Sequence, residues 1–229
     1  MPAPANDNVA VEMRALARHL FSHALIESSI ERAFQRHIVC ERGVLRICED
    51  LHDLNSYGRV FVVSIGKAAH TMVNALQMQG GERFEGIVAS SLETTAQARG
   101  FRYFLSGHPT PNEESIRAAE AILKSLSAQN AASLVVFMIS GGGSSMAEKP
   151  IDGEISLPDL IATYRVLVHS GAPIAEINAI RKHLGSQGWE ACASGISRAA
   201  GLDLCLRCSR QNARRVGLRP DHAGLDNCF

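Results

Sequence analysis

A run of six apolar residues that leads into a glycine-rich loop constrains the fold of this chain more than any other feature. Residues 134–139 show no alternation of apolar and polar side chains, and a Ser-Gly-Gly-Gly-Ser-Ser loop follows at once over residues 140–145. Strands without alternation are typical of parallel sheets that are covered on both faces. The run therefore predicts a buried central strand whose carboxyl end carries an unusual loop.

A second segment predicts the same succession of strand, turn and helix. Residues 60–65 are rich in β-branched side chains, the run stops at Gly66, and residues 67–79 are compatible with a helix. Residues 86–90 and 101–105 predict two further short strands. Strands that alternate with helices favour an α/β fold with a doubly wound, mainly parallel sheet and flanking helices.

Cap signals and apolar spacing locate the remaining helices. Thr110 supplies an N-cap, Pro111 stands at the first helical position and Glu113 completes a capping box, for a helix that runs to about residue 127. The other predicted helices cover residues 9–25, a segment capped by Ser28 or Ser29 that runs to about residue 39, a segment that begins at Ser156, and residues 174–184.

The composition gives the chain no overall charge that would attract a polyanion. Lys and Arg together number 23, as do Asp and Glu, so nucleic acid and anionic membranes are not expected as partners. The longest apolar run is far shorter than the roughly 20 residues of a membrane-spanning helix. The first residues resemble neither a signal peptide nor a transit peptide, which predicts a cytoplasmic location.

The turn at Gly66 and Lys67 follows a buried strand, and open α/β sheets bind ligands at the carboxyl ends of their strands. Glycine lets the backbone approach a ligand, the helix start presents free N–H groups, and the lysine adds a positive charge. Phosphate or carboxylate is the expected ligand. The alternative interpretation is a tight turn with a surface lysine.

The glycine loop predicts a second anion site. Three consecutive glycines have a large ordering cost, so they rarely follow a core strand merely to turn the chain. The backbone amides of Gly141, Gly142 and Gly143 could bind phosphate, while flanking hydroxyl groups donate hydrogen bonds or help to hold Mg²⁺. The flanking serines are Ser140, Ser144 and Ser145. The loop matches neither the P-loop nor the dinucleotide pattern, and a plain flexible loop is the alternative.

Polar residues gather on the predicted helix over residues 174–184. Asn178, Arg181 and Lys182 could point in one direction, because residues three or four apart share a helix face, and two adjacent cations suit a phosphate group. A solvated basic helix end is the alternative. His108 is interpreted as a turn histidine, with a polar role in the site as the alternative.

Four motifs permit a comparison with a known family. They are Gly-Lys-Ala-Ala at residues 66–69, Gly-His-Pro-Thr-Pro-Asn at 107–112, Ile-Ser-Gly-Gly-Gly-Ser at 139–144 and Glu-Ile-Asn-Ala-Ile-Arg-Lys-His-Leu at 176–184. In order and spacing they resemble the bacterial glycerate 2-kinases over residues 11–184. The resemblance implies ATP- and Mg²⁺-dependent phosphorylation of D-glycerate, in a cleft between a Rossmann-like N-terminal domain and a second domain.

The resemblance also implies roles for individual residues. Lys67 is similar to the family's active-site lysine, and Arg181 and Lys182 to the basic pair of its Arg-Lys-His-Leu motif, so these three are the predicted catalytic residues. The predicted cofactor-binding residues are Gly66, Ser140, Gly141, Gly142, Gly143, Ser144 and Asn178. Such roles fit phosphoryl transfer, in which positioning and charge neutralisation contribute most. No metal ligand and no catalytic base is assigned.

The labels given to family members leave the activity open. Members are often labelled hydroxypyruvate reductases, so NAD(P)H-dependent reduction of hydroxypyruvate is the alternative activity. The glycine loop does not resemble a nicotinamide site, which favours the kinase.

After residue 184 the sequence departs from the family pattern. The family's Lys-Gly-Gly-Arg-Leu-Ala segment is absent, and residues 187–192 read Gln-Gly-Trp-Glu-Ala-Cys, followed by a tail without lysine. Codons exist for residues 187–192 that give the missing segment when they are read one nucleotide later. We therefore predict a frameshift near residues 184–187, an N-terminal domain over residues 1–184, and an aberrant, poorly packed tail over residues 185–229.

A domain that stops there lacks half of the expected cleft. We expect an inactive product, or at most a remnant with weak phosphate binding, and a sheet with one unpaired edge. The cysteines of the tail match no standard zinc spacing. No oligomeric state is predicted.

Overall fold

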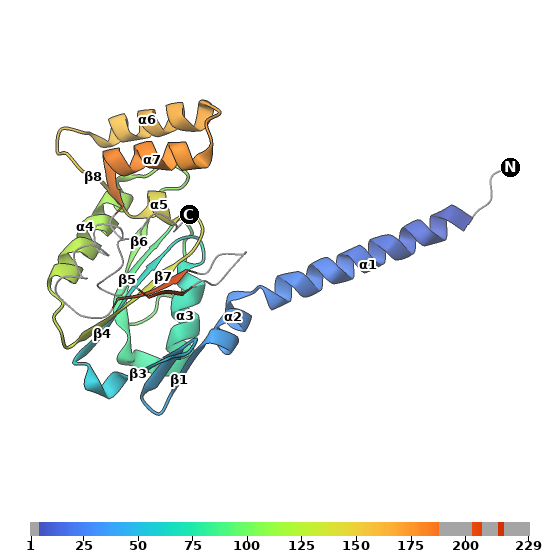
Figure 1. Ribbon diagram of the computed structural model, residues 1–229, viewed down its shortest axis with the longest axis horizontal. Coiled ribbons are helices and arrows are strands. Elements are labelled where there is room, and N and C mark those ends of the chain that lie inside the picture. The colour runs from blue at the N-terminus through green and yellow to red at the C-terminus, as the bar shows by residue number, and fades with distance from the viewer. Residues whose placement is uncertain (1–4, 188–202, 208–214, 218–229) are drawn as a thin grey trace.

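A computed structural model of the chain describes residues 5–187, 203–207 and 215–217 (Figure 1). The helices are α1 (Ala5–Glu27), α2 (Ile30–His37), α3 (Ala69–Gly80), α4 (Glu113–Ser127), α5 (Gly143–Met146), α6 (Leu157–His169) and α7 (Ile174–Leu184), with short 3₁₀ helices at Leu54–Ser56 and Gly81–Arg83. The strands are β1 (Ile38–Glu41), β2 (Val44–Ile47), β3 (Asp50–Asp53), β4 (Arg59–Ile65), β5 (Glu85–Ser90), β6 (Phe101–Leu105), β7 (Ser133–Ile139), β8 (Glu148–Pro150), β9 (Gly185–Gln187), β10 (Asp203–Arg207) and β11 (Arg215–Gly217).

A sheet in the order β11-β10-β7-β4-β5-β6 forms the centre of the described structure. The strands from β10 to β6 are parallel to their neighbours, and β11 is antiparallel to β10. The four strands predicted from the sequence correspond to β4, β5, β6 and β7. The prediction of an α/β fold with a mainly parallel, helix-flanked sheet is confirmed.

Helices cover both faces of this sheet. Val136 of β7 packs in one buried cluster with Leu76 of α3, while its neighbour Val135 packs in another cluster with Ile122 of α4. The two helices lie on opposite sides of the sheet in Figure 1. Because successive side chains of a strand point to opposite faces, a strand that is covered on both faces needs apolar residues throughout. This explains the continuous apolar run that the sequence shows.

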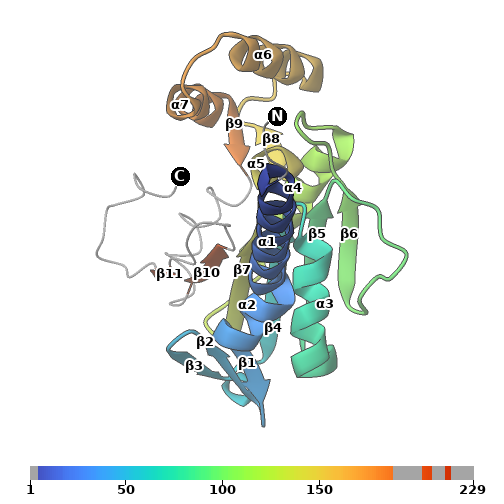
Figure 2. The same cartoon turned by 90° about the vertical axis from the view of Figure 1, so that its right-hand side faces the viewer.

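Smaller elements close the two ends of the molecule. The antiparallel sheet of β1, β2 and β3 lies at one end, and the helix pair α6 and α7 lies at the other, near the strand ends where α5 begins (Figures 1 and 2). β8 and β9 pair in antiparallel fashion, with Pro150 opposite Gly185, and join the base of the helix pair. The helix pair is thereby held above the carboxyl ends of the central strands.

The helix predicted from Thr110 begins later than expected. α4 begins at Glu113, and its N-cap is Asn112, whose side chain accepts a hydrogen bond from the Ser115 backbone N–H. The Ser115 hydroxyl accepts a hydrogen bond from the Asn112 backbone N–H in return. Asparagine is a better N-cap than threonine, and this reciprocal pair fixes the helix start there. The start of α6 after Ser156 agrees with the prediction.

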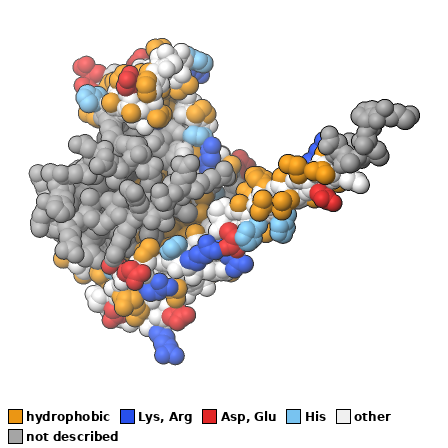
Figure 3. Space-filling view, turned by 45° about the vertical axis from the view of Figure 1, so that its right-hand side comes forward, with side chains coloured by type: hydrophobic (Ala, Val, Ile, Leu, Met, Phe, Trp, Pro, Cys, Tyr) orange, Lys and Arg blue, Asp and Glu red, His pale blue; other side chains and the backbone are white. Residues whose placement is uncertain are grey.

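The first two helices are present, with differences from expectation. α1 extends away from the body of the molecule, and hydrophobic side chains lie along it (Figures 1 and 3). Leu16 is 59% exposed and Phe21 is 67% exposed, so the apolar face that predicted this helix is uncovered in the described structure. α2 ends at His37, before residue 39, because the chain from Ile38 pairs with β2.

The expectation of an unpaired sheet edge beside β7 is wrong. β10 lies parallel to β7, from Asp203 opposite Val135 to Arg207 opposite Ile139. The run Leu-Cys-Leu within β10 is apolar, and the free N–H and C=O groups of a strand edge readily accept such a segment. The prediction of a poorly packed tail otherwise concerns residues 188–202, 208–214 and 218–229, which lie outside the described residues.

Candidate functional site

The turn after β4 is fastened to the glycine loop after β7. Gly66 has a φ of +120°, and a Cβ atom built there would lie 2.2 Å from the Ser140 Oγ, so only glycine fits. The Lys67 backbone N–H donates to the Gly141 carbonyl at 3.0 Å, and the Ala68 backbone N–H donates to the Ser140 Oγ at 3.0 Å. Two loops that are far apart in sequence therefore form one unit at the carboxyl ends of adjacent strands.

The contact between the two loops uses backbone N–H groups that were expected to bind an anion. The sequence predicted free N–H groups at the start of α3, but those of Lys67 and Ala68 are occupied by the glycine loop. The Ser140 hydroxyl joins the two loops, and its predicted contact with phosphate stays a prediction. The Lys67 side chain is exposed, and its ammonium group has no hydrogen-bond or ion-pair partner in the described part of the chain.

The glycine loop itself keeps backbone donors available. Gly142 has a φ of +89°, and the chain then forms the single helical turn α5. Among the described residues, nothing accepts a hydrogen bond from the backbone N–H groups of Gly141 and Gly142. Gly143 is buried, and its N–H donates to the Ser140 carbonyl at 3.3 Å. Ser144 is half-buried and Ser145 is buried.

His108 lies in the bend between β6 and α4, in agreement with its interpretation as a turn histidine, and it also contacts this cluster. Its Nδ1 lies 3.1 Å from the Ser145 Oγ, and the ring packs against Gly142. Partial desolvation lowers the pKa of His108, and the positive charges of Lys67 and Arg181 lower it further. Its place in the Gly-His-Pro motif was the one signal in the sequence that could have revealed it.

Arg181 of α7 is held between two residues that the sequence analysis missed. Its guanidinium carbon lies 4.3 Å from the centroid of the Tyr164 ring, and its Nη2 lies 3.6 Å from the Glu148 Oε2. Tyr164 and Glu148 are buried, and the Arg181 side chain is 15% exposed. Burial raises the pKa of Glu148 to about 7, and the charge of Arg181 opposes this rise. No motif marked either partner, because they come from β8 and α6.

Of the predicted cluster on α7, the structure describes the side chains of Asn178 and Arg181. Ile177, four residues before Arg181, is buried and marks the packed face of the helix. Asn178 is half-buried and makes no hydrogen bond through its side chain to a described residue. The side chain of Lys182 lies outside the described residues. The convergence of Asn178, Arg181 and Lys182 therefore stays a prediction.

The described residues contain no group of three or more His, Cys, Asp or Glu side chains that could hold a metal ion. None of their helices has both the length and the hydropathy of a membrane span.

The fold and the position of the two loops define an α/β protein of the doubly wound class, with its candidate site at the carboxyl ends of β4 and β7. Residues 16–188 match the family described as "Domain of unknown function (DUF4147)". The chain belongs to this family.

The enzyme names of similar proteins connect the family to an activity. The chain is 35% identical over 162 residues to the D-glycerate 2-kinase of Thermotoga maritima. The aligned region covers 70% of this chain and 36% of that enzyme. The chain is 37% identical over 127 residues to the glycerate 2-kinase of Pyrococcus horikoshii, which covers 56% and 28%. It is 38% identical over 130 residues to a putative hydroxypyruvate reductase of Agrobacterium vitis, which covers 56% and 30%.

Solved structures agree with these relatives. The crystal structure of the glycerate kinase of Thermotoga maritima superposes with a TM-score of 0.61 at 30% identity, over 76% of this chain and 39% of that chain. A protein of Pyrococcus horikoshii gives a TM-score of 0.65 at 30% identity with the same coverage. The resemblance to glycerate 2-kinases that the motifs indicated is confirmed. The chain spans about a third of the length of the curated relatives it matches.

Proposed function

We propose that this chain carries the phosphate-binding part of a glycerate 2-kinase, an enzyme that transfers the γ-phosphoryl group of ATP to a hydroxyl of D-glycerate. The observation that carries the proposal is the hydrogen bond that attaches the Lys67 turn to the glycine loop. The Lys67 N–H donates to the Gly141 carbonyl at 3.0 Å, while the Lys67 ammonium has no partner among the described residues. The positive charges of Lys67 and Arg181 also lower the pKa of His108, whose ring packs against Gly142. Names of relatives support the substrate and the reaction.

The chemistry of phosphoryl transfer suits these residues. Charge develops on the phosphate oxygens, and the protein contributes mainly positioning and charge neutralisation. We propose that the unpartnered ammonium of Lys67 and the guanidinium of Arg181 face the phosphate oxygens, with the backbone N–H groups of Gly141 and Gly142 as further donors. Mg²⁺ would accompany the nucleotide phosphates, and we assign it no ligand in this chain.

Binding and catalysis are separate parts of the proposal. The chain spans about a third of the length of its relatives, so we propose that it binds nucleotide phosphates but transfers the phosphoryl group poorly or not at all.

Sequencing the gene across the Leu184 codon tests the related hypothesis of a changed reading frame after an N-terminal domain of residues 1–184. An unbroken frame that encodes residues 185–229 in independent clones would contradict that hypothesis.

The proposed function is tested by calorimetric titration of the full chain with ATP, with and without Mg²⁺. Lys67→Ala should weaken ATP binding about tenfold or more, since it removes a charge from the proposed site. Lys124→Ala is the matched control, because Lys124 is an exposed lysine of α4 that belongs to neither loop. Equal ATP affinity in all three proteins, or no binding at all, would refute the proposal.

The choice between the two activities needs a substrate assay on the same protein. ADP release that depends on D-glycerate, measured against the Lys67→Ala variant, would support the kinase. NADH consumption with hydroxypyruvate and no ADP release would favour the reductase, the activity in the name of the Agrobacterium vitis relatives.

A further inference from the structure

A fully buried carboxylate pairs with Arg181, one of the two cations of the proposed phosphate site. Glu148 is the first residue of β8, and neither oxygen of its side chain has a hydrogen-bond partner among the described residues. A Cβ atom built at Gly185 would lie 2.6 Å from the Glu148 Oε1, so the carboxylate fills the space beside that glycine in β9. A buried carboxylate without hydrogen bonds is costly unless a charge compensates it. Its placement therefore needs an explanation.

Arg181 is the ion-pair partner of this carboxylate, but the pair is loose. The Arg181 Nη2 lies 3.6 Å from the Glu148 Oε2, beyond hydrogen-bond distance, and the Nε and Nη2 atoms have no hydrogen-bond partner in the described structure. The Tyr164 ring supports the guanidinium from another side at 4.3 Å. The guanidinium is thus restricted in position, with its Nε and Nη2 atoms buried and 15% of the side chain exposed.

We propose that Glu148 is a positioning residue, which holds the Arg181 guanidinium beside the glycine loop in the orientation that meets an anionic ligand. This inference rests on the proposed phosphate site. The carboxylate attracts the guanidinium, the Tyr164 ring limits its tilt, and the 15% of the side chain that stays exposed can meet phosphate oxygens. Positioning of this kind raises affinity because the cation is already in place before the ligand arrives.

The proposal and simple electrostatics predict opposite changes in anion affinity when Glu148 loses its charge. Removal of a negative charge near an anion site should tighten anion binding if charge alone matters. Removal of a residue that positions Arg181 should weaken it. Glu148→Gln keeps the shape of the side chain and removes its charge, so the two effects can be told apart.

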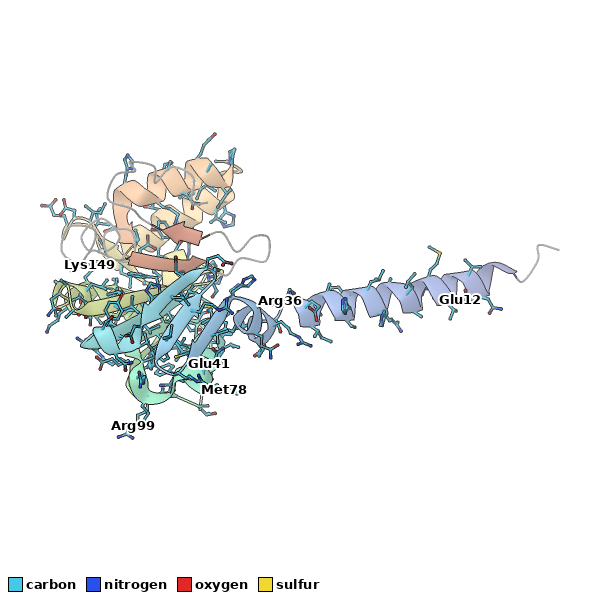
Figure 4. All side chains as sticks on the ribbon, turned by 60° about the horizontal axis from the view of Figure 1, so that its bottom comes forward. Glu12, Arg36, Glu41, Met78, Arg99 and Lys149 are labelled. Atoms are coloured by element: carbon cyan, nitrogen blue, oxygen red, sulfur yellow. The ribbon has the colours of Figure 1, made fainter. Side chains whose placement is uncertain are left out.

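The first experiment measures ATP binding by calorimetry to the full chain at pH 8. We expect Glu148→Gln to weaken binding about tenfold, the usual effect of losing one well-placed charged contact. Glu120→Gln is the matched control, because Glu120 is an exposed carboxylate of α4 that pairs with Lys149 of β8. Figure 4 shows Lys149 on the side of the domain away from α1. The control should bind ATP within about twofold of the unchanged chain.

The second experiment reports the position of Arg181 without any ligand. The Arg181 guanidinium lies over the Tyr164 ring, so the ring shifts the NMR signals of the neighbouring Arg181 Cδ protons. At pH 8, where Glu148 is ionised, displacement of Arg181 should move these signals toward their positions in an unfolded chain. We expect this change in Glu148→Gln, and in Glu148→Asp, whose carboxylate is withdrawn by one methylene group.

These two measurements separate the inference from the proposed function. If the unchanged chain binds no ATP, the proposed function fails, and a shift of the Arg181 Cδ proton signals still supports the role of Glu148. If Glu148→Gln does not fold, as judged by circular dichroism, Glu148→Asp gives both readouts. Unchanged Arg181 signals, or ATP binding that is unchanged or tighter in the folded variant, would overturn the positioning role.

Discussion

At the scale of single residues, the contact between two loops depends on the absence of a side chain at Gly66. A Cβ atom there would lie 2.2 Å from the Ser140 Oγ and 2.6 Å from the Ser140 carbonyl oxygen, and the backbone has a φ of +120°. The backbone of Ser140 cannot withdraw, because its N–H donates to the Ile65 carbonyl at 2.9 Å. The contact therefore has little room to adapt.

Gly66→Ala should lower the free energy of unfolding by about 3 kcal/mol, because it adds both a clash and backbone strain. Gly171→Ala is the matched control: its φ is +73°, but nothing lies within 4 Å of its added Cβ atom. The control should cost only about 1 kcal/mol. Urea unfolding of both variants checks this, and equal losses would show that the contact with Ser140 is unimportant.

Glu148 should make stability depend on pH. Its pKa is raised from 4.5 to about 7 in the folded protein, so the folded state binds this proton more tightly than the unfolded state. Stability is therefore fully present below pH 4.5 and falls as the pH rises through 7, by up to about 3 kcal/mol. Glu148→Gln should remove this part of the pH dependence in urea unfolding. Parallel pH profiles of the variant and the unchanged chain would contradict the assignment.

At the scale of elements, α1 and α3 are both amphipathic, but they differ in what their apolar side chains contact. Leu20 of α1 is 58% exposed, whereas Leu76 of α3 is 2% exposed and packs in the core against the central strands. Burial against other elements, more than helix propensity, gives a helix most of its stability in a protein. Changes in the two helices should therefore have different effects.

Leu20→Ala should change the free energy of unfolding by no more than about 0.5 kcal/mol, because the side chain is exposed. Leu76→Ala should cost about 2 to 5 kcal/mol, because it leaves a cavity in the core. Chemical unfolding of the two variants tests the contrast. A large loss from Leu20→Ala would mean that something covers the apolar face of α1 in solution.

At the scale of the whole molecule, β10 decides whether the parallel sheet ends on an open edge. β10 pairs with β7 along residues 203–207, and β7 is the strand that carries the glycine loop. An exposed strand edge is a template for association with other chains. The segment after residue 187 therefore protects a strand of the proposed site.

A chain shortened to residues 1–187 should aggregate faster than the full chain, and hydrogen exchange in β7 should be faster, because the edge of β7 is then open. A chain shortened to residues 1–217 keeps β10 and β11 and is the control. Light scattering and hydrogen exchange compare the three chains. Equal exchange in β7 in all of them would show that β10 gives no protection in solution.

The sequence predicted much of the fold because its signals are local. Continuous apolar runs predicted β4 and β7, and apolar spacing predicted α1. The start of α4 was misplaced because two adjacent cap signals competed, and Asn112 formed the reciprocal bonds with Ser115. The pairing of β10 was missed because a five-residue strand has little periodicity and depends on the neighbour that it meets.

The sequence by itself determined the class of fold, the family and the loops at the candidate site, because periodicity, caps and motifs are properties of short segments. Only the tertiary structure decided that the Ser140 hydroxyl joins the two loops, that His108 contacts Ser145, and that Glu148 pairs with Arg181. Those contacts join β4, β7, β8 and α7, and they depend on how the strands are ordered and how the helices cover them. No local sequence pattern encodes these contacts, since they follow from the burial of apolar surface over the whole domain.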